Sequence, residues 1–418
     1  MKSAVLPSLR RGLCAFAAAS LFSSTLHAAL PEWPRFRGPN GSGVGQANLP
    51  DAITAQSFNW KIELPGAGHS SPVIAGDRVF VTCNPEGTGK HMLVCVNAKD
   101  GKIAWQHEYD GPEFRKHSDN SFASSTAAVD GERVYIAWMS PGTSGLAALD
   151  QRDGRELWKK DLGPFVSQHG PGASPIVVND LVLLDFDPDE PKSFLAAFDA
   201  KSGAEKWRWE HEGNKHSSST PCIFTPKSGG AQAVTISNTI GMTGVDVKTG
   251  KVAWQLAGLM PKRCVASPIV TEGGLIVGQC GEGQAESFVY AVKVADDGKS
   301  AQKVYEVLRT GGYVPTPLAV GPLLFLWKEN GLVTCLRAAN NEQVWSERVQ
   351  GPFYGSPVAV GARLYNITRK GELVVLSAGE KFQEIARLDL GEGSFATPAV
   401  SGGRMYLRTF THLISVGK

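Results

Sequence analysis

One sequence unit recurs along the chain and limits the folds open to it. Each copy begins with a small residue, usually followed by proline, and runs through three short β-branched segments to a turn bearing Asp or Gly and then an aromatic residue. The second positions of these opening dipeptides are 72, 127, 175, 221, 268, 317, 357 and 398, a spacing that averages about 47 residues. A period of this length accommodates four strands of about 5–6 residues with their turns, which is one blade of a β-propeller.

The composition agrees with many short strands joined by turns. The chain has 47 Gly and 25 Pro among its 418 residues, more turn formers than a helical protein tolerates. Apolar residues spaced i, i+3, i+4 are not sustained along the mature chain. The sequence therefore predicts an all-β fold, an eight-bladed β-propeller of four-stranded antiparallel blades.

The eighth copy is one strand short. It begins at Thr397-Pro398 and ends after its third strand, residues 412–416, which would leave an open sheet edge. Residues 57–61 resemble a fourth strand, and Trp60 precedes Pro72 by 12 residues, as Tyr305 precedes Pro317. We therefore expect the N-terminal strand to complete the last blade and close the ring.

The recurrent tryptophans are predicted to belong to the scaffold. A large ring at the start of each outer strand can cover the backbone of the neighbouring blade, with one N–H left to pair. The residues in these structural docking positions are Trp60, Trp105, Trp158, Trp207, Trp254 and Trp345.

Residues 197–207, Ala-Phe-Asp-Ala-Lys-Ser-Gly-Ala-Glu-Lys-Trp, are the fullest copy of the unit. This pattern resembles the PQQ-like (pyrroloquinoline-quinone) repeat β-propeller family, which includes outer-membrane protein assembly factor B and the propeller of quinoprotein alcohol dehydrogenases. The resemblance covers roughly residues 57–416 and implies the fold. It does not identify an activity, because proteins with this fold have many different functions. Residues 33–43 resemble the opening segment of secreted bacterial members of this family, and we expect them to pack on the ring.

The N-terminus has the features of an export signal. Residues 1–28 have a basic start, an apolar stretch and no acid, which predicts a signal peptide cleaved at about Ala28 and a periplasmic or secreted protein. We then expect a lead-in segment at 29–56 and the propeller at 57–418. No stretch predicts a transmembrane span.

The mature chain is close to neutral. Without the first 28 residues it has 39 basic and 40 acidic residues, so it has no general attraction to nucleic acid. Six cysteines remain, none adjacent to another and none in a C-x-x-C pair: Cys83, Cys95, Cys222, Cys264, Cys280 and Cys335. An oxidising compartment permits disulfides, but buried free thiols are an equal alternative, and the sequence does not determine the pairing.

The loops that precede the inner strands should line the mouth of the central channel. The polar and aromatic residues at these places are His69, His117, His169, His216, Lys262, Arg263, Tyr313 and Tyr354, and Trp327 lies near the same face. Imidazoles suit transition metals and the two cations suit carboxylates, so these residues are candidates for a ligand-binding site. The alternative is that they are polar loop residues around a solvated opening.

An acidic run follows one strand of the third blade. Asp185 and Asp187 are alternate carboxylates that could hold a metal such as Ca²⁺, although Pro188 stiffens the run and no Gly-centred EF-hand loop is present. A solvated acidic loop is the simpler interpretation.

The sequence favours a binding or interaction scaffold in the cell envelope over an enzyme. Quinoprotein dehydrogenases carry a vicinal Cys-Cys pair near the quinone, which this chain lacks, and no G-x-S-x-G, H-E-x-x-H or Walker motif occurs. The alternative is a PQQ- and Ca-dependent quinoprotein-type oxidoreductase using the His-rich mouth. A further alternative is an assembly factor that adds a partner's strand to a blade edge. We expect a monomer that binds an envelope protein or a small-molecule ligand.

Overall fold

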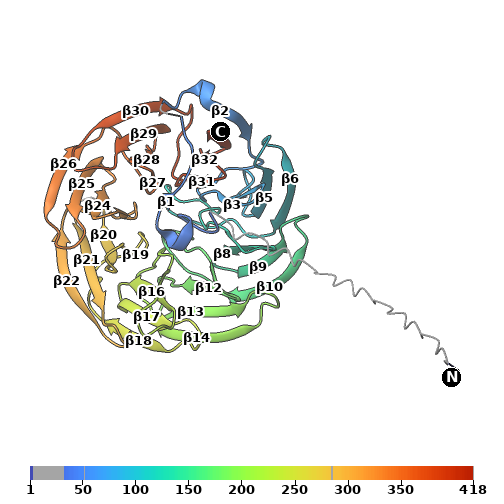
Figure 1. Cartoon of the computed structure of the whole chain (residues 1–418), viewed down its shortest axis with the longest axis horizontal. Helices are drawn as coiled ribbons and strands as arrows, with labels where there is room; N and C mark the ends of the chain where they lie inside the picture. The colour runs from blue at the N-terminus through green and yellow to red at the C-terminus, as the bar shows by residue number, and fades with distance from the viewer. Residues whose placement is uncertain (3–32, 51, 284–285, 418) are drawn as a thin grey trace.

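The computed structural model describes all residues except 3–32, 51, 284–285 and 418. Eight sheets are arranged around a central axis (Figure 1), so the predicted eight-bladed β-propeller is confirmed. In each of the first seven blades the four strands follow one another along the chain, from the inner strand to the outer one. The predicted signal peptide lies almost wholly outside the described residues.

In each of the first four blades the inner strand is shorter than the other three. Blades one and two are β3 (Val73–Ala75), β4 (Arg78–Cys83), β5 (His91–Asn97), β6 (Ile103–Tyr109), and β7 (Ala128–Val129), β8 (Arg133–Trp138), β9 (Ser144–Asp150), β10 (Glu156–Gly163). Blades three and four are β11 (Ile176–Val178), β12 (Leu181–Phe186), β13 (Lys192–Asp199), β14 (Glu205–Glu212), and β15 (Cys222–Phe224), β16 (Gln232–Ser237), β17 (Gly241–Asp246), β18 (Val252–Leu256).

The remaining blades follow the same order. Blades five and six are β19 (Ile269–Val270), β20 (Ile276–Glu282), β21 (Glu286–Val294), β22 (Ala301–Leu308), and β23 (Leu318–Val320), β24 (Leu323–Trp327), β25 (Leu332–Arg337), β26 (Gln343–Arg348). Blade seven is β27 (Val358–Val360), β28 (Arg363–Ile367), β29 (Glu372–Ser377) and β30 (Glu384–Asp389), and blade eight begins with β31 (Ala399–Ser401), β32 (Arg404–Arg408) and β33 (His412–Gly417).

The N-terminal strand completes blade eight, as the sequence predicts. Strand β2 (Phe58–Glu63) pairs antiparallel with β33, with Lys61 opposite Ile414 and Trp60 opposite Ser415. In Figure 1 the two ends of the described propeller lie in the same sheet. The chain thus closes its own ring by backbone hydrogen bonds, and β33 is not left as an exposed edge.

A closed circle of eight hydrogen bonds joins the blades at the small residue that begins each repeat. This residue is always Ser or Thr, and its hydroxyl accepts from the backbone N–H of the same position in the preceding blade. Around the ring the N–H donors and hydroxyl acceptors are Ser71 to Thr126 (2.9 Å), Thr126 to Ser174 (3.0 Å), Ser174 to Thr220 (3.3 Å), Thr220 to Ser267 (3.0 Å), Ser267 to Thr316 (3.1 Å), Thr316 to Ser356 (3.0 Å), Ser356 to Thr397 (3.0 Å) and Thr397 to Ser71 (3.0 Å). The repeat therefore encodes the contact between blades as well as the strand start.

The tryptophans form a second circle at the outer strands. Trp60, Trp105, Trp158, Trp207 and Trp345 donate their indole N–H to backbone carbonyls of the next blade, on Ala98, Gln151, Ala200, Val247 and Gly379 respectively. Trp254 instead donates to Gln232 Oε1 at 2.7 Å, and Gln232 Nε2 donates to Gly298 O of the next blade at 2.7 Å. Gly203 shows why a turn glycine accompanies the ring: its φ is +69°, and an added Cβ would lie 2.6 Å from the Trp158 ring.

The lead-in segment crosses the central channel, where η1 (Pro39–Gly41) lies near the middle of the ring (Figure 1). Arg35 Nη2 donates to Pro221 O at 2.6 Å and Arg37 Nη1 donates to Thr316 O at 2.9 Å, which ties the segment to blades four and six. Short β1 (Val44–Gly45) then adds to β27 in parallel as a fifth strand of blade seven. The segment packs into the ring as expected, and both arginine side chains are buried.

The six cysteines among the described residues are all buried free thiols in this structure. Within the described part of the chain, no helix has the length and apolar character needed to cross a membrane.

Candidate functional site

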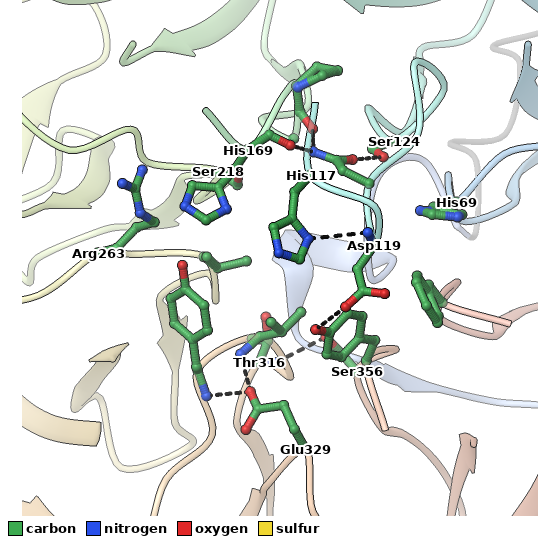
Figure 2. Close-up of a pocket in the computed structure, with 18 of the residues that line it drawn as sticks. His69, His117, Asp119, Ser124, His169, Ser218, Arg263, Thr316, Glu329 and Ser356 are labelled. Atoms are coloured by element: carbon green, nitrogen blue, oxygen red, sulfur yellow. Dashed lines mark hydrogen bonds between the residues drawn. The ribbon is translucent and has the colours of Figure 1, made fainter. Parts of the chain in front are cut away.

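A cavity of about 570 Å³ occupies the end of the channel where loops enter the inner strands. All eight blades contribute to its lining, and Phe36 of the lead-in segment contributes as well. Figure 2 shows side chains from several blades converging on this space. The lining includes His69, His117, His169, His216, Arg263, Tyr313 and Tyr354, so seven of the nine predicted mouth residues reach one cavity.

The four histidines play different parts in the cavity wall. His117 projects into the middle of the cavity and stacks on His169, with ring centroids 5.5 Å apart. His69 packs against Phe395 and Phe410, at centroid distances of 4.7 and 5.4 Å. His216 is buried, with Nδ1 2.8 Å from the Asp187 carbonyl and Nε2 2.7 Å from Ser218 Oγ. The His117–His169 pair is therefore the part of the set best placed to meet a ligand.

Three of the wall histidines, His69, His169 and His216, are neutral at neutral pH. Burial, aided by the nearby Arg408 charge, lowers the pKa of His69 to about 3. Burial also lowers the pKa of His216 to about 4. The pKa of His169 is lowered by burial first and by the charge of Arg263 second. These three imidazoles consequently offer neutral donors and acceptors, not positive charge.

The cations at the mouth are already paired. Arg263 Nη1 lies 2.9 Å from Asp189 Oδ1 and also donates to the His216 carbonyl at 3.1 Å. Lys262 is outside the cavity lining and forms salt bridges with Glu282 (3.2 Å) and Glu286 (2.6 Å). A carboxylate ligand would compete with these internal partners, so simple charge attraction is weaker than the sequence suggests.

One wall of the cavity is a network that the sequence pattern did not identify. Arg369 bonds Asp119 at 2.5 Å and lies over the ring of Tyr354, with its guanidinium carbon 4.3 Å from the centroid. Tyr354 donates its hydroxyl to Asp119 Oδ2 at 2.9 Å. Glu329 accepts from the backbone N–H of Tyr313 at 2.6 Å. Arg369 and Glu329 come from loops between second and third strands, which open at the same end of the channel as the loops that enter the inner strands.

Trp327 does not line the cavity. It is fully buried in the contact between blades six and seven, where its ring meets Phe353 edge-on at 5.3 Å. The prediction that it lies at the mouth is wrong because the end of β24 turns its side chain between sheets, where apolar area is removed from water.

Asp185 and Asp187 form a buried polar pocket between blades three and four, not a solvated acidic loop. Thr235 donates its hydroxyl to Asp185, and Ser193 Oγ lies 2.5 Å from Asp187 Oδ1. Burial raises the pKa of both carboxyl groups, and for Asp187 the neighbouring Asp185 adds to the effect. Among the described residues no cluster of three or more His, Cys, Asp or Glu side chains could hold a metal ion. The suggested metal centre at these two aspartates is therefore not supported.

The chain is similar to known proteins along most of its length. The family model described as outer membrane protein assembly factor BamB matches residues 53–137, 90–294 and 285–409. The assembly factor BamB of Alkalilimnicola ehrlichii is 29% identical over 141 residues, which are 34% of this chain and 32% of that protein. A polyvinylalcohol dehydrogenase of a Pseudomonas species is 26% identical over 178 residues, 40% of this chain and 26% of that protein. The chain thus matches about a third or less of the length of these curated relatives.

Solved structures agree on the fold. The quinohemoprotein alcohol dehydrogenase of Comamonas testosteroni superimposes with a TM-score of 0.64 at 14% identity, covering 94% of this chain and 81% of that one. BamB of Moraxella catarrhalis superimposes with a TM-score of 0.59 at 15% identity, covering 86% of this chain and 96% of that one. At these identities the likeness shows the eight-bladed architecture alone.

Proposed function

Because the chain belongs to the outer membrane protein assembly factor BamB family, we propose that it is a binding scaffold of the bacterial cell envelope. The similar proteins support an envelope setting, since one group of them consists of outer membrane protein assembly factors. In this proposal the export signal directs the chain to the periplasm, and the cavity at the channel mouth receives a partner's side chain or a small molecule.

The observation that carries the proposal is the cavity itself. Its walls come from every blade, its lining is mixed polar and aromatic, and Phe36 of the lead-in segment also lines it. Such a concave, pre-formed surface with a few oriented polar groups is typical of a binding site. Its internal ion pairs, such as Arg263–Asp189 and Arg369–Asp119, hold the wall rigid, so little ordering is required when a ligand binds.

The residues of this cavity do not fit PQQ with Ca²⁺. The carboxylates that line it are Asp119, Glu282 and Glu329, and each is already held by Arg369, Lys262 or a backbone N–H. The described residues provide no group of three metal-binding side chains. Arg369 also covers the face of Tyr354 on which a flat cofactor would stack. These observations favour the scaffold over the oxidoreductase.

Site-specific photo-crosslinking tests the proposal in living cells. A photoreactive residue at His117 reports on the cavity, and one at exposed Lys248, in the turn between β17 and β18, reports on a surface away from it. We expect a discrete adduct from position 117 that is absent from position 248. Equal labelling at both positions, or none at 117, contradicts the proposal.

Titration with PQQ and Ca²⁺ tests the rival function. We expect no saturable change in tryptophan fluorescence and no reduction of an electron-accepting dye with alcohols. Saturable binding accompanied by turnover would replace the scaffold with an oxidoreductase.

A further inference from the structure

Two of the buried cysteines face each other behind the cavity wall. An isolated antiparallel bridge pairs Arg263 with Gly281, and Gly281 N donates to Arg263 O at 3.0 Å. The register of this bridge places Cys264, in the segment before β19, directly opposite Cys280 in β20. The sequence separates the two by a turn and a strand and gives no sign of this pairing.

The two thiols lie in the same buried cluster between blades four and five. The interaction with Cys264 lowers the pKa of Cys280, and burial raises the pKa of Cys264. Directly opposite residues of an antiparallel pair have Cα atoms about 4.5–5.5 Å apart, within the range of about 4.4–6.8 Å that a disulfide requires. The contact therefore needs little backbone movement to become a bond.

We propose that Cys264 and Cys280 form a cross-strand disulfide that fastens the cavity wall to the central strand of blade five. In this step the two thiols lose two protons and two electrons, an S–S bond forms, and the disulfide of a thiol-oxidising protein or of oxidised glutathione is reduced to two thiols. One of the two cysteines, as its thiolate, attacks that disulfide and forms a mixed disulfide; the other then attacks the mixed disulfide and releases the second thiol of the oxidant. Both side chains are fully buried, so the bond forms as blade five folds, before the thiols are enclosed.

The cross-link would act on the binding site because its neighbours line it. Arg263 and Val265, on either side of Cys264, both face the cavity. The Cys264 carbonyl accepts from Ser218 N at 2.9 Å and from Ser217 Oγ at 3.1 Å, which connects the same segment to blade four. Fixing Cys264 thus fixes the edge of the cavity shared by blades four and five. This role rests on the proposed function; the bond itself does not.

Thiol counting on the refolded mature chain tests the cross-link. The protein is refolded with oxidised and reduced glutathione, denatured without reductant and alkylated, and its intact mass is measured. We expect four alkylated thiols of the six, and a peptide digest that links position 264 to position 280. Six alkylated thiols, or a bond between other cysteines, would overturn the proposal.

Two double variants sharpen the experiment. C264A/C280A should still show four thiols and no linked peptide. C95A/C335A is the matched control, because these thiols lie among Phe and Trp side chains on the central strands of blades one and six. The control should keep the linked peptide and show two alkylated thiols.

A melting curve provides an independent measurement. Closing the loop from 264 to 280 should raise the Tm of oxidised over reduced protein by about 4 °C in the wild type, and by nothing in C264A/C280A. The same thiol count on protein isolated from cells separates the two proposals. Four thiols after refolding but six in isolated protein would support the cross-link and contradict the envelope location.

Discussion

At the scale of the residue, the hydroxyl that begins each blade is a structural group that links neighbouring blades. Each of the eight Ser or Thr hydroxyls accepts from a backbone N–H that is buried beside it. A buried N–H without a partner costs more than the hydrogen bond itself contributes, because the group loses its water on folding. A Ser or Thr hydroxyl is therefore required at this position. A small apolar residue would fill the same space but would leave the neighbouring N–H without an acceptor.

Ser267→Ala should destabilise the protein by about 1–3 kcal/mol, since it leaves the Thr220 N–H unpaired. The measurement is the free energy of unfolding in urea. Ser300→Ala, at an exposed position, is the matched control and should change it by less than about 0.5 kcal/mol. Equal effects of the two substitutions would show that the circle of hydrogen bonds contributes little.

At the scale of the element, strand β2 contributes to the ring in two ways. Its backbone completes blade eight on β33, and Trp60 joins blade eight to blade one through Ala98 and Gly101. The lead-in segment before it holds the inner end of the channel through Arg35 and Arg37. Ring closure therefore depends on β2, and the inner wall of the cavity depends on the segment ahead of it.

Deleting residues 29–62 should lower the Tm by more than about 10 °C, because β33 becomes an open edge and blades one and eight lose their contact. Deleting residues 29–46 instead leaves β2 in place and should lower the Tm less. Differential scanning calorimetry of both deletions measures this difference. A melting curve unchanged by the longer deletion would contradict closure by β2.

At the scale of the whole molecule, the response to pH is set by a few buried groups. Residues 29–418 carry 39 basic and 40 acidic residues, so their net charge changes folding little near neutral pH. Histidines whose pKa is lowered in the folded state reduce stability as the pH falls, whereas carboxyl groups whose pKa is raised reduce stability as the pH rises. The pKa of His69 is about 3 and that of His91 about 4, both lowered by burial, while the pKa values of Asp185 and Asp187 are raised by burial.

His69→Phe should reduce the loss of stability in acid. The unfolded histidine takes up a proton below about pH 6.5, whereas the folded one does so only near pH 3, so stability falls as the pH drops through this window. Phenylalanine keeps the packing on Phe395 and Phe410 without titrating. Between pH 7 and pH 5 the variant should lose about 1–2 kcal/mol less than the wild type in urea unfolding. An identical pH profile would show that His69 titrates normally.

Asp187→Asn should change the pH dependence of stability in the opposite direction. The unfolded carboxyl loses its proton near pH 4 but the folded one only at higher pH, so its contribution to stability declines as the pH rises above about 4. Asn is isosteric and can still accept from Ser193. The variant should gain stability relative to the wild type at pH 8 and lose that gain at pH 4, as measured by urea unfolding. Asp153→Asn, in an exposed turn, is the control and should show no such trend.

The architecture was predictable because a local sequence pattern, repeated once per blade, specifies it. Strand period, turn residues and the docking aromatic recur every 40–55 residues, and a missing fourth strand at the C-terminus has one counterpart near the N-terminus. Blade number, closure by residues around Trp60 and the face of the candidate site follow from counting these units. Each depends on contacts within a repeat or between consecutive repeats, where the distance along the chain is fixed.

Tertiary structure alone decided which mouth residues face the cavity and which chemistry they can perform. The sequence placed nine residues at the mouth, but whether Trp327 points into the cavity or between sheets depends on the twist at the end of β24. The pairing of Arg263 with Asp189 and of Arg369 with Asp119 joins different blades, and the contact of Cys264 with Cys280 depends on one bridge in a loop. No periodicity encodes such contacts, because they arise from loop paths that differ from blade to blade.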